Sequence, residues 1–151
     1  MTAIGFTGTR KGMTTEQNIA FRLILPLPDD WHHFHHGDCI GADAQAHDIA
    51  KAAGWSVCIH PPKNGQWRAY CKLDPLPDDG AWDSLDMHDH MMPEENFLRR
   101  NRDIVDTCDR LIACPKETSR RAGTGGTWYT VRYAEHMGKP VTIVWPDGTV
   151  T

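Results

Sequence analysis

The first residues that could do chemistry lie in a glycine-containing loop near the start of the chain, GFTGTRKGMT at residues 5–14. Gly8 allows close approach to the backbone, Thr9 offers a hydroxyl group, and Arg10 offers a cationic donor just before a predicted helix. Because the N-terminal end of a helix carries partial positive charge, this combination favours an anion such as phosphate. The loop lacks the GxxxxGKS/T pattern of a Walker loop, so a plain turn is an equally good interpretation.

A second loop, HGDCIGAD at residues 36–43, places two acidic residues among glycines. Gly37 and Gly41 bracket a tight turn, and Asp43 stands where it could cap the next helix. Asp38 has no obvious capping role, so its carboxylate could accept hydrogen bonds from a ribose diol or act as an acid or base. The alternative is a turn residue that bonds its own backbone.

The third loop, SRRAGTGGTWYT at residues 119–130, is the most specific of the three. Its glycines and Thr127 stand at the start of a predicted helix, where backbone N–H groups can point at a bound phosphate. The helix before it contains LRRNR, in which Arg99 and Arg102 are three residues apart and share a face. Guanidinium groups bind phosphate in a bidentate manner, although a solvated basic face is the alternative.

The elements that must position these loops alternate between strand and helix. Apolar segments predict five strands, at residues 3–6, 31–36, 56–60, 110–114 and 141–145. Thr14 precedes Gln17 by three residues, the spacing of a capping box, and the helix that follows carries Ile19, Leu23 and Leu27 at four-residue intervals.

This alternation predicts an α/β fold, a Rossmann-like three-layer sandwich with helices on both faces of a parallel five-stranded sheet. In the helix before the fourth strand, Phe97, Asn101, Ile104 and Cys108 follow one stripe. Right-handed crossovers and one long connection favour the strand order 3-2-1-4-5. The three loops would then meet at the carboxyl ends of the strands, where ligands bind in such sheets.

The composition limits the class of protein. The chain has 151 residues, of which 40% are hydrophobic and 24% charged, which predicts a single domain over residues 1–151. A formal charge of −4 disfavours a nucleic-acid binder with a diffuse basic surface, but it is compatible with a local basic patch. Five cysteines without a CxxC pair argue against disulfides and a structural zinc site. Without a leader or a long apolar segment, we expect a cytoplasmic protein that does not contact a membrane.

Residues 61–95 are rich in Pro, Asp, Gly and Trp and form too long a segment for a simple connection. Such segments are usually functional, so we expect a lid or a partner-binding excursion. Its aromatic residues Trp67, Tyr70 and Trp82 could stack on a base, or they could pack the segment onto the domain.

Histidines are numerous, nine in all, and two groups of them could hold a metal ion. In WHHFHH, His33 and His35 share one side of a predicted strand. In DMHDHMMPEE, at residues 86–95, histidine and carboxylate side chains crowd together. Because neither group has a clear ligand spacing, we predict no metal site.

The segments GFTGTR, HGDCIGADAQAH, RRNRDIVDTCDRLIACP and GTGGTWYTVRYAEHMGKPVTIVWPDG together resemble the SLOG superfamily, particularly its small stand-alone YspA-like branch. The resemblance spans most of the chain except residues of about 61–95. Similar segments occur in the Rossmann domain of DNA-processing protein A. The resemblance implies a Rossmann-like fold, self-association into a homo-oligomer, no cofactor, and a nucleotide or nucleotide-derived ligand, such as ADP-ribose, that is sensed or sequestered.

Two other functions follow from relatives within this superfamily. LOG-type phosphoribohydrolases cleave the base from a nucleoside monophosphate with an arginine and the glutamate of a GGxGTxxE-like motif, a position that is Thr130 here. An N-glycosidic-bond hydrolase that uses Asp38 as its catalytic carboxylate is therefore the alternative. Binding of single-stranded DNA, as in DNA-processing protein A, is the third, although the acidic charge disfavours nucleic acid. The predicted ligand-binding residues are Gly8, Thr9, Arg10, Gly37, Asp38, Gly41, Arg99, Asn101, Arg102, Gly125, Gly126 and Thr127.

Overall fold

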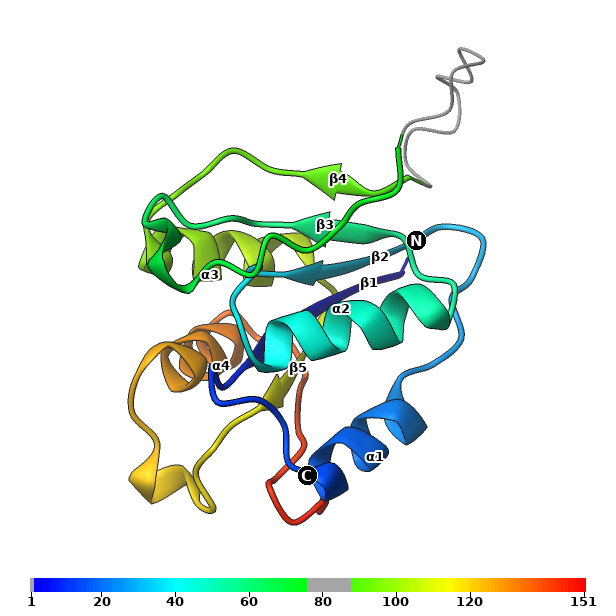
Figure 1. Ribbon diagram of the computed structural model, residues 1–151. Helices are drawn as coiled ribbons and strands as arrows, with labels where there is room; N and C mark the ends of the chain where they lie inside the picture. Colours follow the sequence, from blue (N-terminus) through cyan, green and yellow to red (C-terminus); the bar gives the residue numbers. More distant parts are fainter. Residues whose placement is uncertain (1, 76–87) are drawn as a thin grey trace.

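The computed structural model describes residues 2–75 and 88–151, which form alternating strands and helices (Figure 1). In chain order the elements are β1 (Thr2–Gly8), α1 (Thr15–Ile24), β2 (His32–His36), α2 (Ala42–Ala52), β3 (Val57–Ile59), the 3-10 helix η1 (Gly65–Trp67), β4 (His90–Met91), α3 (Phe97–Thr107), β5 (Arg110–Cys114), the 3-10 helix η3 (Arg120–Ala122), α4 (Gly126–His136) and β6 (Val141–Ile143).

The strands form one parallel sheet in the order β4-β3-β2-β1-β5-β6. The predicted order of five strands is confirmed, because those strands are β3, β2, β1, β5 and β6. The sheet has one more strand than predicted. This strand, β4, comes from the segment 61–95 and pairs with Cys58 and Ile59 of β3.

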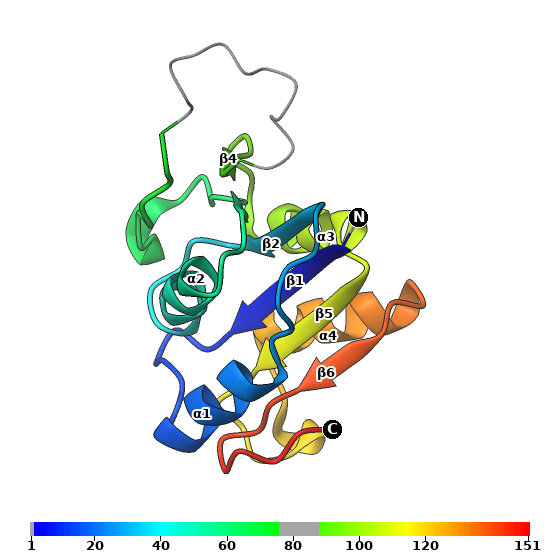
Figure 2. The same cartoon turned by 90° about the vertical axis from the view of Figure 1, so that its right-hand side faces the viewer.

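Helices α1 and α2 lie on one face of the sheet, and α3 and α4 lie on the other, which gives the predicted three layers (Figure 2). On the first face Phe6, Phe21 and Phe34 pack with ring centroids 5.3 to 6.2 Å apart. On the second face Trp128 of α4 belongs to an apolar cluster with residues of α3, β5 and β6. None of the described helices combines the length and the apolar character needed to span a membrane.

Helix α1 begins as predicted, because Thr14 and Gln17 form a capping box. The predicted apolar stripe of Ile19 and Leu23, by contrast, is wrong, since both side chains are exposed. The helix buries a neighbouring face that includes Phe21 and Gln17, whose amide donates to two backbone carbonyls. Phe21 fills the space between Phe6 and Phe34, so the aromatic core rather than the four-residue spacing sets the buried face.

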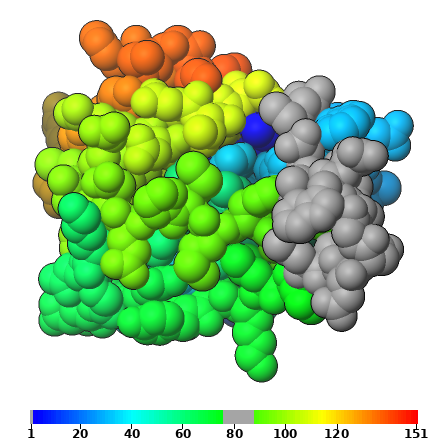
Figure 3. Space-filling model, turned by 90° about the horizontal axis from the view of Figure 1, so that it is seen from above, coloured from blue at the N-terminus to red at the C-terminus, as the bar shows by residue number. Residues whose placement is uncertain are grey.

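The outermost strand at each edge of the sheet is short. At one edge, β4 is two residues long, and the space-filling view onto this side shows residues 88–107 between residues 57–75 and α4 (Figure 3). At the other edge the chain turns back after β6. Ile143 and Thr151 exchange two backbone hydrogen bonds, of 2.8 and 3.0 Å, and Val144 forms an antiparallel bridge with Val150.

Candidate functional site

A cavity of about 490 Å³ lies at the carboxyl ends of the central strands. The three loops that the sequence singled out, 5–14, 36–43 and 119–130, all contribute to its lining. Helix α3 and the tryptophan of η1 supply further lining residues. The cavity has the size of an ordinary small-molecule site and the location at which open α/β sheets bind ligands.

The loop after β1 forms one side of the cavity with Gly8, Thr9, Arg10 and Lys11. The Thr9 hydroxyl accepts a hydrogen bond from the Lys11 backbone N–H at 3.2 Å. The Arg10 guanidinium lies over the ring of Trp67, 4.5 Å from its centroid. This contact brings the segment 61–95 to the cavity and presents a cation and an aromatic face together.

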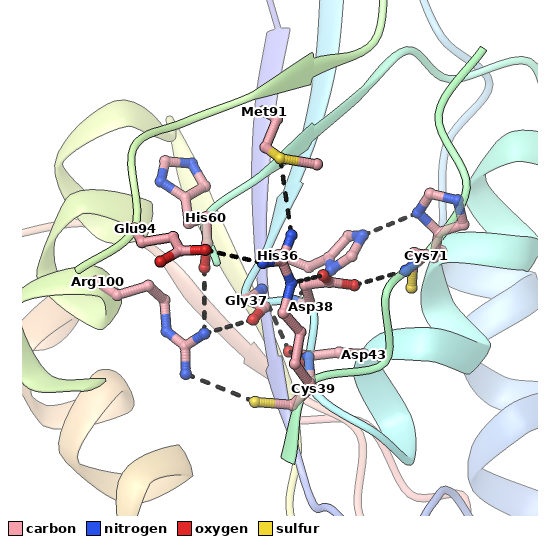
Figure 4. Close-up of polar contacts among 12 residues, drawn as sticks. His36, Gly37, Asp38, Cys39, Asp43, His60, Cys71, Met91, Glu94 and Arg100 are labelled. Atoms are coloured by element: carbon pink, nitrogen blue, oxygen red, sulfur yellow. Dashed lines mark hydrogen bonds and ion pairs between the residues drawn. The ribbon is translucent and has the colours of Figure 1, made fainter. Parts of the chain in front are cut away.

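Asp38 follows β2 but does not line the cavity. Its backbone has a positive φ of 56°, and its side chain is completely buried. The carboxylate accepts hydrogen bonds from Arg68 Nε at 2.9 Å and from the Cys71 backbone N–H at 2.8 Å (Figure 4). Asp38 therefore fixes residues 68–71 to the loop after β2, with its charge compensated by Arg68.

Asp43 does line the cavity, although its predicted role as a helix cap is wrong. The N-cap of α2 is Gly41, and Asp43 Oδ2 instead accepts from the backbone N–H groups of Gly37 and Cys39, both at 3.2 Å. Burial raises the pKa of the Asp43 carboxyl to about 6, against the attraction of the nearby Arg100 guanidinium. The carboxyl group thus titrates near neutral pH.

Arg100 is the buried cation of the cavity, and its residue is only 4% exposed. Its guanidinium donates to the carbonyl oxygens of Gly37 and His60, the latter at 3.1 Å (Figure 4). It also donates to Asn101 Oδ1 at 2.7 Å. It also lies 3.6 Å from Cys39 Sγ. Within residues 2–75 and 88–151, no carboxylate forms an ion pair with it. A positive charge is therefore held in place by neutral acceptors at the cavity wall.

The neighbouring arginines of α3 point elsewhere. Arg99 is exposed and pairs with Asp103 one helical turn later, at 3.3 Å. Arg102 donates to the hydroxyl of Tyr129 at 2.6 Å and is exposed as well. Neither of them lines the cavity. Both belong to a solvated basic face of α3, the alternative interpretation of the sequence.

Helix α4 begins at the cavity with a glycine N-cap, Gly125, whose φ is 85°. No side chain caps this end of α4, whereas Thr14 and Asn96 cap α1 and α3. Gly126 and Thr127 line the cavity, so the uncapped N–H groups and the positive end of the helix dipole lie beside it. Thr130 is buried one turn later and donates its hydroxyl to the Gly126 carbonyl at 2.8 Å.

The structure thus brings together most of the predicted binding residues. Those that line the cavity are Gly8, Thr9, Arg10, Gly37, Asn101, Gly125, Gly126 and Thr127, and those that do not are Asp38, Gly41, Arg99 and Arg102. Gly41 has a structural position: its φ is 87°, and a Cβ atom there would overlap the Arg10 carbonyl. The charged lining residues that the sequence did not single out as binding residues include Asp43, Arg100, Lys116 and Glu117.

In the described part of the segment 86–95, residues 88–95, acidic side chains have separate partners. Asp89 is buried, pairs with Lys51 at 2.8 Å and accepts the Val57 backbone N–H at 2.8 Å. Glu94 pairs with Arg68, and His90 belongs to β4. Among the other residues predicted for this segment, Tyr70 is exposed beside Arg68, while Trp82 and Asp86 lie outside the described residues.

Comparison with known proteins identifies the fold. No family model matches the sequence, and no curated protein matches it. The structure is similar to the X-ray structure of TM1055, a structural genomics target, with a TM-score of 0.59 and 14% identity over 93% of this chain and 72% of that one. It is also similar to DNA processing protein A from Helicobacter pylori, described for its single-stranded DNA binding mode, with a TM-score of 0.58 and 18% identity.

The second comparison covers 94% of this chain and 64% of the Helicobacter pylori protein, so this chain spans less than two thirds of that protein. At these identities the likeness concerns the fold and not the activity. The YspA-like branch of the superfamily stays a prediction from the sequence. Membership of the SLOG superfamily also stays a prediction, and the comparisons show that the chain has a Rossmann-like fold.

Proposed function

We propose that the cavity binds a nucleotide or a nucleotide-derived ligand such as ADP-ribose through its phosphate groups. The observation that carries this proposal is the buried guanidinium of Arg100, which lines the cavity without a carboxylate partner among the described residues. A buried cation whose hydrogen-bond acceptors are all neutral is stabilised further by an anion, and the nearby Asp43 carboxyl attracts it without forming an ion pair. Phosphate oxygens match the donor geometry of a guanidinium group.

The opposite side of the cavity supports the same class of ligand. Helix α4 directs uncapped N–H groups toward the cavity at Gly126 and Thr127, and such ends bind phosphate. Lys11 and Lys116 add positive charge nearby. The site is thus locally basic even though the chain carries a net charge of −4.

Trp67 supports a ligand that carries a base as well as phosphate. Its ring already stacks with the guanidinium of Arg10, and it is half-buried at the cavity. A purine or pyrimidine can stack on such a ring whatever its substituents. A volume of about 490 Å³ falls within the range of pockets for ligands of nucleotide size.

Hydrolysis of an N-glycosidic bond is a second candidate function, and Asp43 favours it. A carboxyl group with a pKa of about 6 at a cavity wall suits a general acid or base. Asp38, the carboxylate expected for this role, is instead engaged by Arg68 and Cys71. Release of free base from a nucleoside monophosphate, abolished in Asp43→Asn, would support catalysis in addition to binding.

Isothermal titration calorimetry with AMP, ADP and ADP-ribose tests the proposal. We expect saturable binding of at least one of them, weakened about 30-fold or more by Arg100→Met and unchanged by Arg99→Met, which alters an exposed arginine of the same helix. Because Arg100→Met removes a buried group, Arg10→Met at the surface gives a second test in a folded protein. An absence of binding by the wild-type protein, or equal binding by all variants, contradicts the proposal. Binding of a single-stranded oligonucleotide in preference to every nucleotide also contradicts it.

A further inference from the structure

Strand β2 carries histidines toward both faces of the sheet. Successive side chains of a strand point to opposite faces, so His35 faces α3 and His36 faces α2. Among the described residues, two groups of two histidines and one cysteine bring their donor atoms within 4.8 Å of one another. One group contains His35, Cys58 and His60, and the other contains His36, His47 and Cys71.

The group around His36 is a hydrogen-bond chain. The Asp38 backbone N–H donates to His36 Nδ1 at 3.0 Å, so the proton of this neutral imidazole is on Nε2. His36 Nε2 then donates to His47 Nδ1 at 2.9 Å, and His47 Nε2 donates to the Lys72 carbonyl at 2.8 Å. Each ring nitrogen has a partner of the right kind, and His36 Nε2 has no lone pair left for a metal ion.

The group around His35 has a different geometry. The register of β2 and β3 places His35 beside Cys58, and His60 follows two residues later on the same side. His60 Nε2 lies 2.9 Å from His35 Nδ1 and 3.8 Å from Cys58 Sγ. Tetrahedral zinc with ordinary bond lengths separates two nitrogen ligands by ~3.3 Å and a nitrogen from a sulfur ligand by ~3.6 Å. The two distances from His60 are thus within about 0.4 Å of those of a tetrahedral arrangement, and the donor atoms of His35 and Cys58 lie within 4.8 Å of each other.

Unlike His36, His35 has no backbone N–H contact among the described residues that fixes which of its ring nitrogens carries the proton. The hydroxyl of Thr107 lies 3.4 Å from this atom, but it donates to the Asp103 carbonyl at 2.8 Å and to the Ile104 carbonyl at 3.1 Å. One proton lies between the two imidazole nitrogens 2.9 Å apart, and it must move to the other nitrogen of its ring before both can bind a metal ion. The three residues are at most 8% exposed, so water competes little for their donor atoms.

We propose that His35, Cys58 and His60 bind a zinc ion, a site that the sequence spacing did not predict. Two imidazoles and one thiolate form a donor set that suits Zn²⁺, and three protein ligands leave its fourth position to another group. The rings of His33 and His90 lie on the same side of the sheet, with His33 6.0 Å from His35 and 5.4 Å from His90.

Binding of zinc would change the protonation state of the cysteine ligand. Burial raises the pKa of the Cys58 thiol to about 12. When the Zn–S bond forms, the S–H bond therefore breaks and one proton passes to the solvent for each ion bound.

The zinc site would lie directly behind the proposed ligand cavity. The carbonyl of His60 accepts from Arg100 at 3.1 Å, so a metal ion that fixes His60 also fixes one of the groups that hold this arginine. This consequence depends on the geometry of Arg100 and not on the identity of the ligand in the cavity. The zinc site does not depend on the proposed function.

Titration of the metal-free protein with Co²⁺ tests the site, because a thiolate bound to cobalt gives a charge-transfer band in the near ultraviolet. We expect a band that saturates at one ion per chain, disappears on addition of one equivalent of Zn²⁺, is lost in Cys58→Ser and persists in Cys71→Ser. Elemental analysis after loading with zinc and desalting should give the same pattern of stoichiometry.

Thermal unfolding with and without Zn²⁺ shows whether each variant is folded and whether it binds. Zinc should raise the Tm of the wild-type protein and of Cys71→Ser, and it should leave the Tm of a folded Cys58→Ser or His60→Gln unchanged. No saturable band in the wild-type protein, a band unchanged in Cys58→Ser, or a band lost only in Cys71→Ser overturns the proposal.

Discussion

The cavity has an inner wall and a rim that hold their charges in different ways. At the inner wall, Arg100 and Asp43 are buried, and backbone groups of the loop after β2 fix both side chains. At the rim, Arg10, Lys11 and Lys116 are exposed, and Arg10 rests on an aromatic ring. The wall is therefore organised before a ligand arrives, whereas the rim can adapt to it.

This difference indicates a division of labour. Exposed cations attract an anion over a distance set by the salt concentration and so act mainly on the association rate. Buried donors with fixed geometry act mainly on the dissociation rate and on selectivity. Substitutions at the wall should therefore affect stability and affinity together, and substitutions at the rim should lower affinity through a slower association while leaving stability nearly unchanged.

The largest effect should come from Gly41→Ala, at the joint between wall and rim. Gly41 has a φ of 87°, and a Cβ atom there would overlap the backbone of Arg10. Backbone strain and overpacking together should lower the free energy of unfolding by about 4 kcal/mol, measured by urea denaturation. Gly125→Ala is the matched control, since Gly125 has a φ of 85° with no atom within 4 Å of the added Cβ. It should cost about 1 kcal/mol, and equal losses for the two variants would contradict the steric argument.

The second effect concerns the buried carboxyl group of the wall. The pKa of Asp43 is raised from 3.8 to about 6 in the folded protein, so folding favours its protonated form. Its contribution to stability is complete below pH 4 and is lost as the pH rises through 6. Asp43→Asn should remove this loss and be more stable than the wild-type protein by up to about 3 kcal/mol at pH 8 relative to pH 4. Urea denaturation of both proteins at several pH values measures the difference, and parallel pH profiles would refute the prediction.

A smaller effect is expected at the rim. Lys116→Met removes one exposed cation, which should slow association of a nucleotide about threefold at low salt and leave the free energy of unfolding within about 0.5 kcal/mol of wild type. Stopped-flow measurements at two salt concentrations test this, because the difference should shrink at the higher one. A change confined to the dissociation rate would contradict this prediction and show that Lys116 acts like the buried residues of the inner wall.

The smallest effect should come from Arg102→Met, outside the cavity. Its contact with Tyr129 is fully exposed to solvent, so neither the free energy of unfolding nor the nucleotide affinity should change measurably. Denaturation and calorimetry on this variant set the baseline for the other three. A large loss of nucleotide affinity in this variant would indicate that the ligand binds the exposed face of α3 and not the cavity.

Several features of the fold could be predicted because they depend on local patterns. The apolar runs and glycine turns give the five strands their order, and Thr14 with Gln17 starts α1 where expected. Strand β4 could not be found in this way, because His90 and Met91 are too few residues to show a strand pattern and lie between polar residues and Pro93. Its position depends on long-range pairing with β3.

The sequence predicted where the site lies but not every side chain that forms it. Arg100 lies next to Asn101 and in phase with Ile104 on the stripe predicted to face inward, and this signal could have identified it as buried. Its charge favoured the opposite interpretation, because buried arginines are rare. The different environments of Asp38 and Asp43 depend on a positive φ and on Arg68, thirty positions away from Asp38, which no local pattern contains.

The short segments at the two edges of the sheet bear on how copies of this chain can meet. Along β6, residues 149–151 already occupy the backbone groups of the outer edge, and at the opposite edge β4 offers only two residues. An uncovered edge strand is a template for extending a sheet from one molecule to the next, with aggregation as the usual result. Within residues 2–75 and 88–151 neither edge offers a long template, which favours contacts between copies through the helical faces and loops over extension of the sheet.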